Sequence, residues 1–268
     1  MPFTLAHPAA AVPLRRVLGK SGVLSALIIG SLTPDFAYFL PWNIDLMQAR
    51  GGTHSLLGIF WFCLPVGLLA YWVFHALVKH PALLLLPEGL HARLTPVANG
   101  GSRMTRNSFW AVVLSLGVGA LTHPVWDGFT HYGAPGMQLL PVLGTTVAHV
   151  FGQTIRLYNV LQHSSTLLGL GLLTWWTARW YRAAPRPGVA GPRLPERTRV
   201  VLLATIVAVT ALGSLVGGWS VARVGQGWWA VEAFVWHAAV WGMGTFGLSL
   251  ILFGLVTRGL TRQVLAES

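Results

Sequence analysis

Apolar stretches long enough to cross a bilayer dominate this chain of 268 residues. A transmembrane helix needs about 20 mainly apolar residues. Stretches of about that length stand at residues 56–77, 108–126, 164–181, 200–219 and 231–256. Only 9% of the residues are charged, whereas roughly a quarter are charged in an ordinary soluble domain. The sequence therefore predicts an all-α fold, a polytopic membrane helix bundle with about five clear spans.

A further apolar run at residues 22–40 is interrupted by a Thr-Pro-Asp turn that ends at Asp35. A break of this kind is tolerated at membrane depth only where protein or water satisfies the freed backbone groups. We expect this run to form a broken or re-entrant helical segment, which lets His7 and Asp35 join other polar groups on one side of the membrane. The alternative is a complete span, which would keep His7 away from them.

The charge distribution predicts partners and orientation. The net charge of +11 comes from basic residues beside apolar stretches rather than from a patch interleaved with aromatic residues. It therefore indicates a lipid bilayer and not nucleic acid as the partner. The loops 78–107 and 182–199 and the C-terminal tail are basic, whereas the loops 127–163 and 220–230 hold one arginine each. The former should face the cytoplasm and the latter the outside.

The same pattern predicts three parts. Residues 1–181 form a membrane-embedded domain that carries the candidate metal site. Residues 182–199 form a basic linker rich in proline and glycine, which is the composition of an extended or flexible connection. Residues 200–268 form a C-terminal pair of membrane helices.

The motif His123-x3-Asp127-x3-His131 ends the stretch that begins near residue 108. Residues four apart share one face of a helix. On a straight helix, however, the two histidines would be roughly 12 Å apart. Either the helix breaks near Gly128, or Asp127 bridges two ions about 3.5–4 Å apart. A helix end whose polar groups only hydrogen-bond one another is the competing interpretation.

Other imidazoles and carboxylates join this motif as candidate metal ligands. The full set is His7, Asp35, His54, His123, Asp127, His131 and His163. Mixed nitrogen and oxygen ligands suit zinc, manganese or iron better than calcium or magnesium. A tetrahedral ion takes four ligands, so seven candidates leave room for more than one ion. We expect a divalent metal, zinc by preference, with one to three ions bound.

Several of these residues stand in motifs that resemble known families. The opening MPFT-x2-HPAA, the Gly-Ser-Leu-Thr-Pro-Asp turn, Thr-His-Ser and the His-x3-Asp-x3-His motif look like an uncharacterised bacterial membrane family of unknown function. The same skeleton is similar to inner-membrane metal-dependent hydrolases of the YdjM type. More remotely, the order of the ligands resembles the zinc-dependent phospholipase C and single-strand nuclease fold. The resemblance to the phospholipase C and nuclease fold implies a trinuclear zinc site that cleaves phosphodiesters, and the resemblance to the YdjM type implies a protein of the bacterial inner membrane.

Together these features lead us to expect a membrane-bound metal-dependent hydrolase, with its site facing outside. Its substrate would be a phosphoester in a lipid or lipid-linked molecule. Asp127 and His131 are the candidate catalytic residues, and Arg15, Arg16 or Arg156 would bind the substrate phosphate, because guanidinium groups match phosphate well. An ion or proton transporter and a non-catalytic membrane scaffold with a structural His/Asp cluster are the alternatives.

Overall fold

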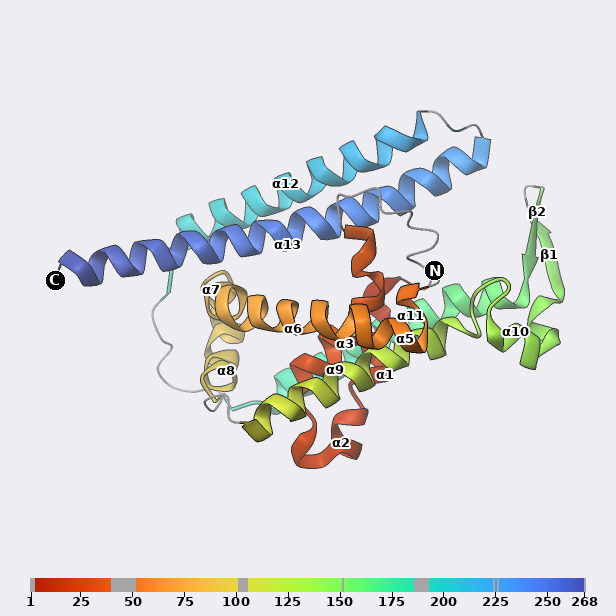
Figure 1. The fold of residues 1–268 in the computed structure, drawn as a ribbon. Helices are drawn as coiled ribbons and strands as arrows, with labels where there is room; N and C mark the ends of the chain where they lie inside the picture. The colour runs from red at the N-terminus through yellow and green to blue at the C-terminus, as the bar shows by residue number, and fades with distance from the viewer. Residues whose placement is uncertain are drawn as a thin grey trace. The chain divides into compact units, whose positions relative to one another are not determined.

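The computed structural model describes residues 3–39, 52–100, 106–150, 152–185, 193–223, 225 and 227–267. Within them the regular structure is helical apart from one short β-hairpin, which confirms the predicted all-α membrane helix bundle (Figure 1). It divides into two compact units. The first comprises Met1–Tyr71 and Arg103–Ala183, and the second comprises Trp72–Ser102 and Ala184–Ser268. Residues 186–192, at the centre of the predicted linker, lie outside the described residues.

The first unit contains short N-terminal helices, three longer helical segments and the hairpin. In chain order its elements are α1 (Pro8–Ala11), α2 (Leu14–Leu18), α3 (Leu24–Leu32), α5 (Leu56–Gly58), α6 (Leu64–Val73), α9 (Arg106–Asp127), α10 (Pro135–Leu139), β1 (Thr146–Val150), β2 (Gln153–Arg156) and α11 (Leu157–Ala183). Single 3-10 turns cover Thr4–Ala6, Gly19–Ser21, Thr33–Phe39 and Pro141–Gly144. The end of α6 continues into the second unit, because the boundary falls between Tyr71 and Trp72.

Four helices of the described residues are long and apolar enough to cross a membrane. They cover Leu56–Leu84, Ser108–Asp127, Glu196–Ala222 and Gly227–Leu260. The fifth predicted span, residues 164–181, does form a helix within α11. It does not meet the same hydropathy requirement, because polar residues such as Ser164, Thr166 and Arg179 interrupt its apolar ones.

The N-terminal apolar run forms a broken helical segment, as predicted. The helix α3 has only nine residues and passes into the 3-10 turn Thr33–Phe39. The break comes at Pro34, which has no N–H to continue a helical ladder. The Thr33 hydroxyl instead donates to the Gly30 carbonyl at 2.6 Å. The segment Leu24–Phe39 is too short to count as a candidate span. Asp35, at the break, lies in the same region as the end of α9.

Two glycines allow α3 and α9 to pack backbone against backbone. A Cβ added to Gly30 would overlap the Leu116 carbonyl, and one added to Gly119 would overlap the Leu27 carbonyl. Small residues serve this purpose in membrane helix pairs generally. The contact is extended by Ser115, whose hydroxyl accepts from the Val23 N–H at 2.9 Å and donates to the Ser21 carbonyl at 3.1 Å.

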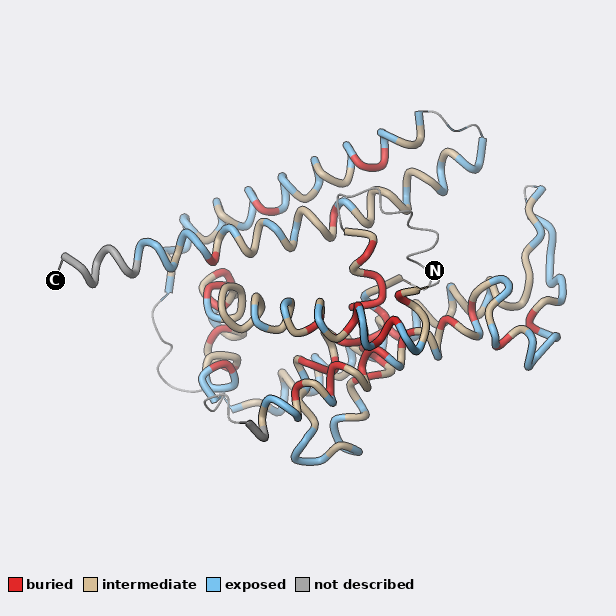
Figure 2. Tube along the Cα trace, viewed as in Figure 1, coloured by how far each residue is buried: buried red, intermediate tan, exposed pale blue. Residues whose placement is uncertain are grey.

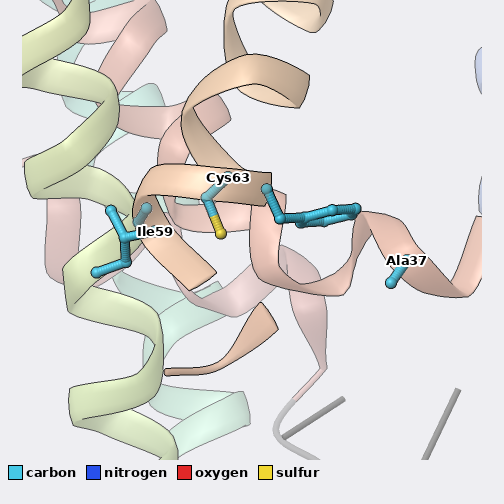
Figure 3. Packing of buried hydrophobic residues seen from close by; sticks show 5 residues of the cluster. Ala37, Ile59 and Cys63 are labelled. Atoms are coloured by element: carbon cyan, nitrogen blue, oxygen red, sulfur yellow. The ribbon is translucent and has the colours of Figure 1, made fainter. Parts of the chain in front are cut away.

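A buried apolar cluster lies next to this helix pair. It contains Ala37, Ile59, Phe62, Cys63 and Ala120 (Figure 3). Ile59–Cys63 is a π turn, in which the Leu64 N–H donates to the Ile59 carbonyl. Pro65 follows immediately and has no N–H for the preceding turn, which explains the wider turn there. The wide turn places Cys63 where its thiol donates to the Thr53 carbonyl at 3.6 Å, beside His54.

The second unit is built on a helix pair. Its elements are the end of the long apolar helix, α7 (Lys79–Leu84), α8 (Glu88–Asn99), α12 (Glu196–Ala222) and α13 (Gly227–Glu267). The two long helices run antiparallel. Gly213 meets Thr245 and Gly217 meets Trp241, so the helices approach closely. Most of their remaining surface is exposed (Figure 2), as expected for helices that face hydrocarbon chains.

Candidate metal centre

The structure brings two imidazoles and two carboxylates to one point in the first unit. The Asp35 Oδ1 atom lies 3.3 Å from His54 Nε2 and 3.5 Å from His123 Nε2. The Asp127 Oδ2 atom lies 3.3 Å from His123 Nε2 and 4.0 Å from His54 Nε2. Asp35 and His123 have no measurable exposure, and Asp127 is 8% exposed. We call these four residues the ligand cluster.

The distances within the ligand cluster fit groups that could hold a metal ion. A charge-assisted hydrogen bond between imidazolium and carboxylate measures about 2.7–2.9 Å. Two ligands of a tetrahedral ion, with bonds of about 2.0–2.1 Å, lie about 3.3 Å apart. The closest pairs here, at 3.3–3.5 Å, match the second value. In addition, Asp35 Oδ1 and the Nε2 atoms of His54 and His123 are buried without a hydrogen-bond partner.

Genuine hydrogen bonds in the same region are much shorter and orient the ligands. The Thr4 hydroxyl donates to Asp35 Oδ2 at 2.6 Å, which leaves Oδ1 of that carboxylate to face the imidazoles. The His123 Nδ1 atom lies 2.7 Å from the Ser31 carbonyl. A carbonyl only accepts, so Nδ1 carries a proton, and Nε2 is the nitrogen that faces the two carboxylates. Support of this kind from the next layer of residues is typical of metal sites.

His7 adds a third buried imidazole. Its ring stacks on that of His123 with a centroid distance of 3.6 Å, and its Nε2 lies 3.6 Å from Asp127 Oδ1. Both of its nitrogens are buried without a hydrogen-bond partner. Burial, together with the nearby His123 ring, lowers the pKa of His7 to about 3. The ring is therefore neutral at pH 7, which is the form that binds metals.

His131 lies at the rim of the ligand cluster. The helix α9 ends at Asp127, immediately before Gly128, so the first of the two alternatives for this motif is confirmed. The turn that follows returns His131 Nδ1 to 3.1 Å from the Asp127 carbonyl and 3.6 Å from Asp127 Oδ1. Its Nε2 is buried without a partner. Burial lowers the pKa of His131, with opposing contributions from Asp127.

The charge of Asp35 is stabilised in this setting. Burial alone would raise the pKa of this carboxyl group, but the neighbouring imidazoles of His123 and His54 and the Thr4 hydroxyl hold it below its usual range. The carboxylate is thus ionised at neutral pH. A buried, ionised carboxylate is stable only beside positive charge or hydrogen-bond donors, which the imidazoles or a bound cation can supply.

Local sequence explains how each ligand reaches this point. His7 directly precedes α1, with Pro8 in the first helical position, where a missing N–H costs nothing. His54 precedes Ser55, whose hydroxyl accepts from the Gly58 N–H at 3.0 Å and caps the long apolar helix. His123 and Asp127 are one turn apart on α9. All of these residues therefore stand at or near helix ends.

A family model described as "Domain of unknown function (DUF4184)" matches residues 1–257. The chain belongs to this family. No curated protein and no solved structure matches it. Membership in the DUF4184 family thus extends over both units and includes every residue of the cluster.

The structure does not bring the remaining candidates to the ligand cluster. His163 lies in α11, and its side chain is exposed. The positions of α11 that contact the N-terminal segment are Thr166, which accepts from the Phe3 N–H at 3.1 Å, and Gly169 beside Ala6. Among the described residues, His163 belongs to neither of the two groups of side chains that could hold a metal ion.

The three candidate arginines differ in position. Arg15 and Arg16 lie on α2 and are exposed, with no contact to the cluster among the described residues. Arg156 ends β2, and its guanidinium lies 5.5 Å from the centre of the Tyr132 ring. Tyr132 directly follows His131, so Arg156 is the one of the three that is connected to the rim of the site.

Two supporting groups were not identified from the sequence. One is the Thr4 hydroxyl, and the other is the Ser31 carbonyl that fixes the His123 ring. A signal for Thr4 was present, because it stands in the MPFT opening three residues before His7. No sequence signal exists for a backbone carbonyl, since every residue has one.

Proposed function

We propose that this protein is a membrane-bound, metal-dependent hydrolase that cleaves a phosphoester. The observation that carries the proposal is the set of 3.3–3.5 Å distances among Asp35, His123, His54 and Asp127. They are too long for charge-assisted hydrogen bonds and fit neighbouring ligands of one ion. The buried and unpartnered Nε2 atoms support the same conclusion.

The donor set limits the metal. Two imidazole nitrogens and two carboxylate oxygens suit Zn²⁺, Mn²⁺ or Fe²⁺, and we propose zinc. The second carboxylate oxygen, Asp127 Oδ1, faces His7 Nε2 at 3.6 Å and supports an adjacent position for another ion. A divalent ion bound here would act as a Lewis acid and lower the pKa of a coordinated water molecule.

The residues at the rim support hydrolysis over a purely structural role. The side chain of His131 is 28% exposed, the largest exposure among the imidazoles paired with Asp127. Part of its side chain is therefore accessible at the rim, whereas its Nε2 atom is buried and unpartnered and could serve as a further ligand or as a proton acceptor. Asp127 would hold the ion and orient His131 through its backbone carbonyl. A fully enclosed cluster would have no such accessible group.

The membrane setting supports a lipid or lipid-linked phosphoester as substrate. His54 and Asp127 stand at ends of the candidate spans Leu56–Leu84 and Ser108–Asp127, so an amphiphile in the bilayer can present its headgroup to them. Arg156 is the arginine best placed to pair with phosphate. The ligand order also resembles that of zinc-dependent phospholipases C and single-strand nucleases, and that resemblance remains part of the proposal.

The location of the protein is proposed from the distribution of its basic residues. Basic loops on one side of the spans favour a bacterial inner membrane protein whose cluster faces outside. The depth of the polar residues argues against a transporter. A proton or ion pathway needs polar groups along the spans, and the residues of the cluster stand at span ends instead.

Hydrolysis of a chromogenic phosphodiester by the detergent-purified, zinc-loaded protein tests this proposal. We expect activity in the wild type, a loss of about a hundredfold in Asp127→Asn, and complete loss with a chelator. The exposed His163 provides the matched control, and His163→Ala should retain activity. Activity at the wild-type level in Asp127→Asn, together with wild-type activity that is unchanged by the chelator, would contradict a metal-dependent reaction at this site. Absence of hydrolysis in a metal-loaded wild type would favour the scaffold alternative.

A further inference from the structure

The residues that follow the candidate span Ser108–Asp127 form a segment without any charged residue of the Asp, Glu, Lys or Arg type. It runs from residue 128 to residue 155, between Asp127 and Arg156. We call it the charge-free segment. An ordinary soluble loop of this length would carry about seven charged residues, at roughly a quarter of the positions. Its composition therefore differs from that of a loop surrounded by water and indicates a less polar environment.

Large apolar side chains of the charge-free segment point away from the protein. Leu139 is 74% exposed, and Val142 and Val147 are each 56% exposed. The others with large exposure are Phe129, Leu140 and Val150. In the first unit the hairpin β1–β2 projects beyond the helices (Figure 1). Figure 2 shows that β1 is exposed along its length.

The strand β1 is uncovered on both faces. Alternate residues of a strand point to opposite sides, so the consecutive and regularly paired His149 and Val150 project from different faces of β1. All five residues of β1 are exposed. A two-stranded hairpin alone in water is marginally stable at best. An apolar surrounding that contacts both faces would stabilise it.

The base of the hairpin carries the residues expected at a headgroup layer. Tyr132 is 72% exposed, and its ring centre lies 6.1 Å from that of Tyr158. The Arg156 guanidinium lies over the Tyr132 ring. Tyrosine and arginine side chains concentrate at membrane–water boundaries, where the ring is half apolar and the cation meets phosphate. The segment also begins where a candidate span ends, which places its start at a boundary of the membrane.

We propose that the charge-free segment inserts into the interfacial layer of the bilayer. The hairpin and α10 contact acyl chains, and Tyr132 and Arg156 lie at the level of the headgroups. This lipid contact is independent of whether the cluster binds metal. It goes beyond the proposed function because it assigns a membrane-binding element outside the spans, beside the rim residue His131.

Site-directed fluorescence in lipid vesicles tests the proposal. The natural Cys63 is 1% exposed and is replaced by alanine, and single cysteines are introduced by Val150→Cys and Val142→Cys. Each is labelled with the environment-sensitive dye NBD. Leu114→Cys, at a 47% exposed position of the candidate span, is the lipid-facing control. Lys20→Cys, at an exposed charged position, is the control for water.

We expect lipids brominated along the acyl chain to quench the dye at Val150 and Val142 about as strongly as at Leu114, and at least about twofold more than at Lys20. Aqueous iodide should quench it less than at Lys20. Strong quenching by iodide with none by brominated lipid would overturn the proposal. Protection from both quenchers, with cross-linking between copies through these cysteines, would overturn it in favour of a second copy of the chain as the occupant.

Discussion

The imidazole of His123 is fixed by the backbone of Ser31, a residue 92 positions earlier in the chain. Its Nδ1 lies 2.7 Å from the Ser31 carbonyl, and its Nε2 is directed at Asp35 and Asp127. This relationship depends on the close packing of α3 against α9. The geometry of the ligand cluster therefore depends on the contact between these two helices.

Replacement of Thr4 tests the support of Asp35. Thr4→Val preserves the shape of the side chain but removes the 2.6 Å hydrogen bond to Asp35 Oδ2. We expect metal affinity to fall about 10–100-fold, because the carboxylate loses its orientation. Competition with a fluorescent chelator measures the affinity. Thr174→Val, in which an exposed threonine loses only a bond within its own helix, should leave the affinity unchanged. Equal affinities for the two variants would contradict this role of Thr4.

Replacement of Gly30 tests the helix contact. A Cβ at this position overlaps the Leu116 carbonyl, which is backbone and cannot rotate away. Gly30→Ala should therefore lower the stability by about 1–3 kcal/mol and lower the metal content as well. Thermal unfolding in detergent measures the first effect.

Gly171 supplies the control for that experiment. It lies in α11, and a Cβ added there would have no neighbouring atom within 4 Å. Alanine at this position should stabilise the protein by up to about 1 kcal/mol, because glycine is a poor helix former. A Gly30→Ala variant as stable as Gly171→Ala would show that α3 and α9 do not pack as closely as described.

Replacement of Arg156 tests its proposed role toward substrate. Arg156→Gln removes the guanidinium but leaves the ligand cluster intact. We expect KM for a phosphodiester to rise about tenfold, while the metal content stays at the wild-type level. Arg15→Gln, on the exposed helix α2, should change neither quantity. A KM that responds to Arg15→Gln and not to Arg156→Gln would assign the phosphate contact to the other arginine.

Much of the site was predictable because short-range spacing determines it. His123 and Asp127 share a helix face by their separation of four residues, and the glycine after Asp127 indicated where the helix ends. The interruption before Asp35 likewise indicated a broken segment rather than a span. Asp35 and His54 could be nominated, although their contact with α9 depends on tertiary packing.

The remaining features depend on information that spacing does not contain. His163 follows the ligands in sequence order, but its orientation on α11 is determined by which face packs on the N-terminal segment, and the side chain is exposed. The hairpin β1–β2 was expected to be part of a loop. Its two strands are short and are paired with each other. Hydrophobic periodicity reveals a strand only where one face is buried, and β1 is exposed at every position.

Elemental analysis of the detergent-purified protein tests the central claim most directly. We predict at least one equivalent of a divalent transition metal in the wild type and in His163→Ala, and less than about a tenth of that in His123→Ala and Asp35→Asn. Size-exclusion chromatography identifies variants that have lost their fold. Wild-type protein that stays metal-free after incubation with zinc, or a metal content equal in all four proteins, would contradict the assignment of this cluster as a metal centre.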